Sequence, residues 1–142
     1  MAVKPIPDGY HAVTPYLVVN DLKKQLEFFE KALGAKVIFN METHAEVQLR
    51  DSRIMAGQAR PPHGPKPAML YLYVEDCDAA YKKAIENGGE SVHEPTTQFY
   101  GDRSGAVKDV NGNEWWFGTH VEDVSDEELK KRAQAMHAAG KK

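Results

Sequence analysis

A repeat within the sequence constrains the fold of this chain more strongly than any other feature. Residues 16–21, YLVVND, recur as residues 71–76, YLYVED, at an offset of 55 residues, and Gly34 matches Gly89 at the same offset. Self-similarity at a fixed spacing indicates that one structural unit is used twice along the chain. The two copies are therefore expected to share one fold.

Both copies show the same order of local patterns. Each opens with a β-branched and aromatic stretch that runs into an aspartate suited to cap a helix, Asp21 in the first copy and Asp76 in the second. Apolar residues at helical spacing follow, and each helix ends at a glycine, which can adopt the left-handed conformation. Three strands are predicted after each helix, so the sequence indicates an α+β fold of two βαβββ units. These strands span residues 36–41, 44–50 and 53–58 in the first copy and 91–98, 103–109 and 114–119 in the second.

Two further segments complete the predicted organisation, which is a single domain. Four prolines between residues 59 and 68 cannot donate ladder hydrogen bonds, so this stretch is interpreted as a stiff connector between the copies. Ser125, with Glu128 three residues later, forms a capping box and predicts a last helix. The expected boundaries are about 10–58 for repeat one, 59–68 for the linker, about 69–119 for repeat two and about 125–139 for the C-terminal helix.

Composition argues against several classes of protein. With 142 residues and 42% hydrophobic content, the chain can bury one core of ordinary size. Its 21 acidic and 18 basic residues are interspersed, which argues against a nucleic acid partner. The single cysteine, Cys77, cannot form an internal disulfide, no signal segment is recognised, and no apolar run approaches the roughly 20 residues that cross a bilayer. A cytoplasmic protein without membrane association is expected.

The repeat, the helix end at residues 28–34, FFEKALG, and the hairpin at residues 109–113, DVNGN, resemble the vicinal oxygen chelate superfamily, also called glyoxalase/bleomycin resistance/dioxygenase. This resemblance spans residues 14–119. Within it, residues 98–105, QFYGDRSG, and 119–124, THVEDV, resemble the PhnB-like subgroup. The resemblance implies two curled mixed sheets that form an open cup, helices on the outside, and a homodimer that builds or completes the cavities.

For metal-dependent members, the resemblance implies four ligands from the first, fourth, fifth and eighth strands, which leave open positions for two vicinal substrate oxygens. The matching positions in this chain are Thr14, Met55 or Ala56, Met69 and Trp116. Threonine is a poor ligand, methionine is too soft, and alanine and tryptophan cannot bind such a metal. No metal or other cofactor is therefore expected. Weak metal candidates are His44 and Glu46, which lie two apart on one strand and share a face.

Strand alternation predicts what the cup presents in place of metal ligands. If Thr14 and Met69 face the cup, the tyrosines two residues further along the same strands face it too. An aromatic cup suits a flat or amphipathic organic molecule, although core or dimer-interface packing is an equally good interpretation of each tyrosine. Arg103 could bind an anionic ligand group, or could pair with Asp102 or across a dimer. The candidate ligand-binding residues are Thr14, Tyr16, Met69, Tyr71, Tyr73, Tyr100, Arg103 and Trp116.

Three functions fit these observations. The leading hypothesis is a metal-free, homodimeric, small-molecule-binding protein of the PhnB-like subgroup, whose ligand no motif identifies. The alternative is a metal-dependent lyase, isomerase or dioxygenase that acts on a substrate with adjacent oxygens and binds its metal through displaced ligands such as His44 and Glu46. The third is a scaffold whose cup is filled by its own side chains and whose surface binds another protein.

Overall fold

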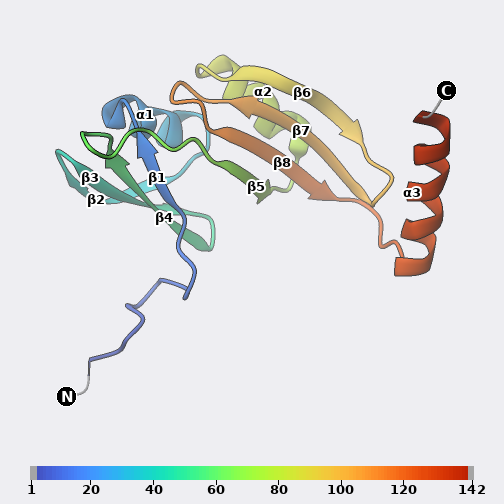
Figure 1. Ribbon diagram of the computed structural model, residues 1–142, viewed down its shortest axis with the longest axis horizontal. Coiled ribbons are helices and arrows are strands. Elements are labelled where there is room, and N and C mark those ends of the chain that lie inside the picture. The colour runs from blue at the N-terminus through green and yellow to red at the C-terminus, as the bar shows by residue number, and fades with distance from the viewer. Residues whose placement is uncertain (1–2, 141–142) are drawn as a thin grey trace.

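The computed structural model describes residues 3–140 and confirms the two βαβββ units (Figure 1). Every strand boundary predicted after the two helices lies within one residue of the observed one. A C-terminal helix, α3 (Asp126–Gly140), follows the second unit. The first unit contains β1 (Tyr16–Val19), α1 (Leu22–Lys31), β2 (Lys36–Met41), β3 (His44–Leu49) and β4 (Ser52–Gln58). The second contains β5 (Met69–Tyr73), α2 (Cys77–Glu86), β6 (Glu90–Thr97), β7 (Asp102–Lys108) and β8 (Glu114–His120).

Each unit forms one four-stranded mixed sheet, and the two sheets have equivalent strand orders. The order is β1-β4-β3-β2 in the first sheet and β5-β8-β7-β6 in the second. In each sheet the first strand of the unit runs parallel to the last, and the other neighbours are antiparallel. Tyr16 pairs with Met55, and Tyr71 pairs with Trp116, so the repeated tyrosines occupy equivalent positions in the two sheets.

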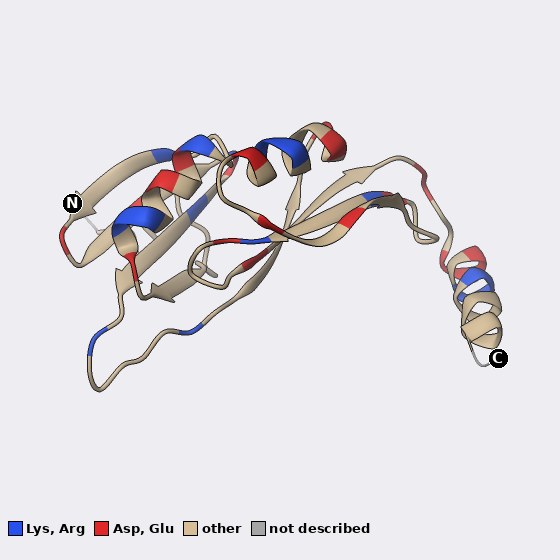
Figure 2. Ribbon diagram, turned by 90° about the horizontal axis from the view of Figure 1, so that it is seen from above, with Lys and Arg blue, Asp and Glu red and all other residues tan. Residues whose placement is uncertain are grey.

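The helices α1 and α2 begin where the repeat places an aspartate. The carboxylate of Asp21 accepts a hydrogen bond from the backbone N–H of Lys24 at 3.0 Å, and Asp76 caps α2 through Ala79 at 3.1 Å. Both helices lie along the upper part of the molecule in Figure 1. Lys and Arg alternate with Asp and Glu along them, as Figure 2 shows, so neither helix presents a surface of one sign.

The hydrophobic core is continuous across the two units. Phe29 of α1 meets Trp115 of β8 edge to face, with 5.8 Å between the ring centroids. Phe117, two residues after Trp115, is buried in the same cluster together with Leu17 of β1. Because side chains alternate along a strand, these residues define the helix-covered face of each sheet.

A buried polar network also joins the two units. Gln25 of α1 is fully buried and donates to the carboxylate of Asp109 at 2.9 Å. Asp109 also accepts from the indole N–H of Trp115 and from the backbone N–H groups of Asn111 and Asn113, each at 2.9 Å. The amides of Asn111 and Asn113 in turn donate to the side-chain oxygen of Gln25 at 3.0 and 3.1 Å. The Asn-Gly hairpin between β7 and β8 therefore holds the first helix against the second unit.

The linker and α3 lie at the edges of the molecule. Lys66 of the linker donates its backbone N–H to the carbonyl of Val18 at 2.9 Å, so the linker runs beside β1. Helix α3 stands at one end of the second sheet (Figure 1) and buries none of its residues. Arg132 connects it to the body through the carbonyl of Phe99 at 3.0 Å and the carboxylate of Glu122 at 2.9 and 3.0 Å. No helix within residues 3–140 is long and apolar enough to cross a membrane.

Candidate functional site

Aromatic side chains line the sheet face that points away from the helices. Tyr16 exposes 50% of its surface, Tyr71 41% and Tyr73 57%, and Met69 beside them exposes 66%. Leu17, which follows Tyr16 and points to the other face, is 1% exposed. The tyrosines therefore remain open while their neighbours in sequence form the core.

Asp102, at the start of β7, is the centre of a hydrogen-bonded cluster on the open face of the second sheet. It is 4% exposed. Its Oδ2 accepts from the hydroxyls of Tyr71 and Tyr73, both at 2.9 Å. Its Oδ1 lies 2.9 Å from Nδ1 of His120, whose Nε2 lies 2.8 Å from the carboxylate of Asp123. One buried carboxylate thus organises two tyrosines and a histidine.

Gly118 leaves the space that the side chain of Tyr71 needs to reach Asp102. Strand β8 lies between β5, which carries Tyr71, and β7, which carries Asp102. The tyrosine ring must therefore cross β8, and a Cβ atom at Gly118 would overlap that ring. A glycine at this position is required by the close approach, since its backbone conformation is one that other residues also adopt.

The hydrogen bonds determine which groups of the cluster are charged. Burial by itself would raise the pKa of Asp102, but its three hydrogen-bond donors outweigh burial and hold this pKa below its usual value. Burial, together with the bond to Asp102, raises the pKa of Tyr71, and the bond to Asp102 raises the pKa of Tyr73. At neutral pH the cluster therefore holds an ionised carboxylate beneath two neutral phenols.

The imidazole of His120 is expected to titrate above its ordinary value of 6.5, because hydrogen bonds to Asp102 and Asp123 favour its protonated form and raise its pKa. A group whose pKa is raised in the folded state stabilises the fold at pH values below its unfolded pKa, and this contribution is lost as pH rises through the folded pKa.

An NMR titration should show that the His120 pKa falls toward 6.5 in Asp102→Asn. It should be unchanged in Asp126→Asn, which replaces an exposed acid of α3. The same His120 pKa in all three proteins would contradict this assignment.

The first sheet uses the same arrangement with different partners. Tyr16 of β1 crosses Gly57 of β4, and its hydroxyl lies 3.1 Å from Nδ1 of His44 on β3. Nε2 of His44 lies 2.9 Å from the carboxylate of Glu46. Both ring nitrogens of His44 are thus hydrogen-bonded, so a metal bound by His44 would first have to displace Tyr16 or Glu46.

The residues that the resemblance places at metal-ligand positions do not fit a metal. Thr14 donates its hydroxyl to the backbone carbonyl three residues earlier, at 3.2 Å, and Met55 and Met69 offer only thioethers. Trp116 donates its indole N–H to Glu114 at 3.3 Å and has no lone pair to give a metal. Within residues 3–140, no three His, Cys, Asp or Glu side chains gather as metal ligands would.

Two other predicted ligand-binding residues take different places. Tyr100 lies beside the cluster, with its hydroxyl 3.4 Å from Oγ of Ser104. Arg103 does not pair with Asp102, which was one expectation, but forms two bonds of 2.7 and 2.9 Å with Asp78 of α2. Asp102 faces the tyrosines, and side chains alternate along β7, so Arg103 faces the helices. The structure therefore does not bring Arg103 to the tyrosines.

Sequence analysis did not identify the roles of Asp102 and His120. Alternation along β8 could have placed His120 at the site. His120 lies two residues after Gly118 and four after Trp116, so the three residues share one face of the strand. No local pattern shows that Asp102 meets Tyr71, because 31 residues separate them.

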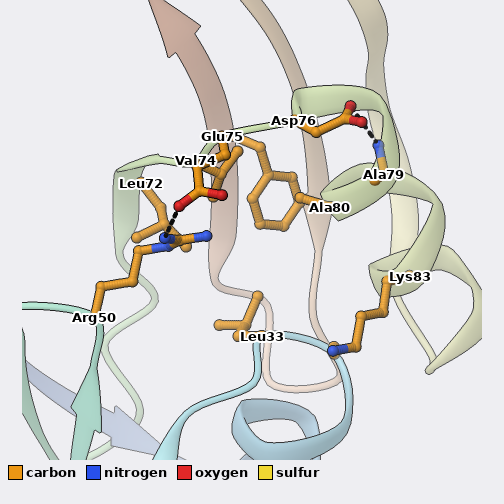
Figure 3. A pocket seen from close by; sticks show the side chains of 11 residues that line it. Leu33, Arg50, Leu72, Val74, Glu75, Asp76, Ala79, Ala80 and Lys83 are labelled. Atoms are coloured by element: carbon orange, nitrogen blue, oxygen red, sulfur yellow. Dashed lines mark hydrogen bonds and ion pairs between the residues drawn. The ribbon is translucent and has the colours of Figure 1, made fainter.

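A separate cavity of about 260 Å³ lies on the helix side, between the two units (Figure 3). Leu33 and Leu72 provide apolar walls, and Lys83 borders the cavity from α2. Figure 3 shows Arg50 reaching toward Glu75, and the two charged groups are 3.9 Å apart. None of the predicted ligand-binding residues lines this cavity.

Comparisons with known proteins agree with this architecture. The sequence model of the Glyoxalase/Bleomycin resistance protein/Dioxygenase superfamily matches residues 10–117. An uncharacterized protein of Mycobacterium bovis is 28% identical over 136 residues, which cover 84% of this chain and 90% of that protein. The crystal structure of TioX from Micromonospora sp. ML1 superposes with a TM-score of 0.70 at 17% identity, over 78% of this chain and 99% of TioX. Lactoylglutathione lyase from Agrobacterium tumefaciens superposes with a TM-score of 0.63 at 17% identity, over 82% of this chain and 96% of that chain. At these identities the structural likeness shows the fold alone.

Proposed function

Since this chain belongs to the glyoxalase/bleomycin resistance protein/dioxygenase superfamily, we propose that it binds a small organic molecule directly, without the superfamily's metal. The proposed binding site is the tyrosine face, which we define as Tyr71, Tyr73, Asp102 and His120. Within the superfamily we assign the chain to the PhnB-like subgroup, on the two sequence strings at residues 98–105 and 119–124.

The observation that carries this proposal is the buried carboxylate of Asp102 behind two half-exposed phenols. An ionised carboxylate is costly to bury unless donors satisfy it, and Asp102 has three donors at 2.9 Å. Aromatic rings held by a few well-placed polar groups are typical of sites for small organic molecules. A cluster of this kind on an uncovered sheet face supports a binding role.

We also propose that a second copy of the chain closes the cup over the tyrosine face. The open face of the first sheet adds Phe39, which is 47% exposed, and Met41, which is 52% exposed. They pair in register with Glu46 and His44, so they share the face of Tyr16. Exposed apolar side chains that share one sheet face favour an interaction site there.

We also propose a cytoplasmic setting for the protein, because its one cysteine is a buried free thiol.

The metal-dependent alternative is less well supported. A lyase, isomerase or dioxygenase of this superfamily would have to recruit His44 and Glu46, which are hydrogen-bonded to each other at 2.9 Å. Within residues 3–140, no third His, Cys, Asp or Glu joins this pair, whereas such metal sites use at least three protein ligands.

A melting-temperature screen tests the binding role. Some member of a panel of flat and amphipathic organic molecules is expected to raise the melting temperature, since a ligand that binds only the folded state adds about 2.7 kcal/mol of stability at 100 times its Kd. The double variant Tyr71→Phe/Tyr73→Phe keeps both rings, loses both hydroxyls and is expected to lose the response. Tyr81→Phe removes a hydroxyl bonded to Ser91, away from the tyrosine face, and should respond as the wild type does. Failure of the whole panel, or an unchanged response in the double variant, would count against the proposed function.

A further inference from the structure

We infer that the molecule bound at the tyrosine face carries a protonated amine. This inference rests on the proposed function, because it names the class of ligand for the same site. It follows from the direction of the hydrogen bonds that Tyr71 and Tyr73 make and from the charges around Asp102.

The phenols of Tyr71 and Tyr73 have no proton to offer a ligand. A phenol carries one donor, and both hydroxyls donate it to Oδ2 of Asp102 at 2.9 Å. An ionised carboxylate only accepts hydrogen bonds, so Asp102 cannot return a proton to either hydroxyl. What remains on each hydroxyl is oxygen lone-pair capacity, and at Tyr71 the hydroxyl of Tyr100 is a neighbouring hydrogen-bond partner. A ligand group that meets both oxygens must therefore be a hydrogen-bond donor.

The two tyrosine rings favour a positively charged donor. The ring centroids of Tyr71 and Tyr73 lie 5.2 Å apart, and the ring planes are inclined by 60°. The face of an aromatic ring attracts a cation, and it does so more strongly where water is excluded. An ammonium group over this pair would contact the rings and donate to their oxygens at the same time.

The charged side chains around the site also favour a cation. Asp102 and Asp123 lie on either side of His120, so even a protonated His120 offsets only one of the two carboxylates and the group remains negatively charged. Arg103 is held on the helix side by Asp78. Lys108 shares the open face, but it lies six residues further along β7, which corresponds to about 20 Å. An anionic ligand group would thus meet acceptor oxygens and negative charge.

Titration of the full chain with two flat fluorescent dyes tests this inference. Proflavine is cationic and carries amine N–H donors, whereas anilinonaphthalene sulfonate is anionic. The wild type is expected to bind proflavine at least about tenfold more tightly than it binds anilinonaphthalene sulfonate. The affinity for proflavine should fall about tenfold in Asp102→Asn. Glu75→Gln removes the same charge from a side chain that is 95% exposed, and it should leave proflavine binding unchanged.

Circular dichroism establishes whether Asp102→Asn is folded. If it is not, Tyr71→Phe/Tyr73→Phe takes its place, because this variant keeps the rings and removes the acceptor oxygens. Unchanged proflavine affinity in the folded variant, or equal binding of the anionic dye through the same residues, would overturn the inference. An anionic ligand that depends on both hydroxyls would overturn this inference and leave the proposed function standing. Absence of any ligand that depends on the tyrosine face would overturn both.

Discussion

Replacing Asp109 with alanine is expected to lower the free energy of unfolding by about 3 to 5 kcal/mol. Asp109 is 5% exposed and accepts hydrogen bonds from Gln25 and Trp115, both fully buried. Its loss removes the hydrogen-bond partner of the amide of one and of the indole N–H of the other, and both side chains are buried. Since the free energy of unfolding of a native protein is about 5 to 15 kcal/mol, this loss is a large fraction of the total stability.

Urea unfolding followed by tryptophan fluorescence measures the effect of Asp109→Ala. Glu75→Ala serves as the control, because it removes an exposed acid and should change the free energy of unfolding by no more than about 0.5 kcal/mol. A loss below about 1 kcal/mol for Asp109→Ala would mean that the network does not hold the two units together as described.

Gly118→Ala is expected to act on the site as well as on stability. The added methyl would overlap the ring of Tyr71, which must swing away from Asp102 and break their hydrogen bond. Overpacking of this kind costs about 1 to 3 kcal/mol. Binding at the tyrosine face should fall at the same time, since Asp102 then loses one of its donors.

Gly64→Ala is the matched control for Gly118→Ala. A Cβ atom at Gly64 would meet no other atom within 4 Å, so its melting temperature and its ligand response should equal those of the wild type. Both variants are compared by thermal unfolding with and without ligand. Wild-type ligand response in Gly118→Ala would show that Tyr71 does not need to cross β8 to form the site.

The repeat made the fold predictable, because it fixes the order of elements twice over. Its glycines and aspartates mark helix ends in both copies, so a misread strand in one copy can be corrected from the other. Alternation from Thr14 and Met69 also predicted that Tyr16, Tyr71 and Tyr73 share one face, since each strand has a period of two. These predictions depend on local periodicity, which can be read directly from the sequence.

The partners of Asp102 could not be predicted in this way. The sequence pattern predicted a strand that begins at Arg103, whereas β7 begins at Asp102, one residue earlier. Asp102 pairs with His120, and Arg103 pairs with Thr119. Because adjacent side chains of a strand point to opposite faces, Asp102 lies within the site and Arg103 lies on the other face. The bond from Tyr71 to Asp102 also depends on the order of three strands, which no local pattern determines.

The role of Gln25 is another feature that local patterns miss. A polar residue in an amphipathic helix is expected on its solvent side, yet Gln25 is fully buried. It is accommodated because Asp109, Asn111 and Asn113 meet it from a hairpin more than 80 residues later. The Asn-Gly pattern predicted the turn, and only the packing of the two units gives its side chains their second role.

The central claim is that the cup holds its ligand without the superfamily's metal. The metal content of the purified, untagged protein tests this claim most directly. Elemental analysis is expected to find far less than one Mn, Fe, Ni or Zn per chain, with no difference between the wild type and His44→Ala. One metal ion per chain in the wild type, lost in His44→Ala, would contradict the claim and favour the metal-dependent enzyme.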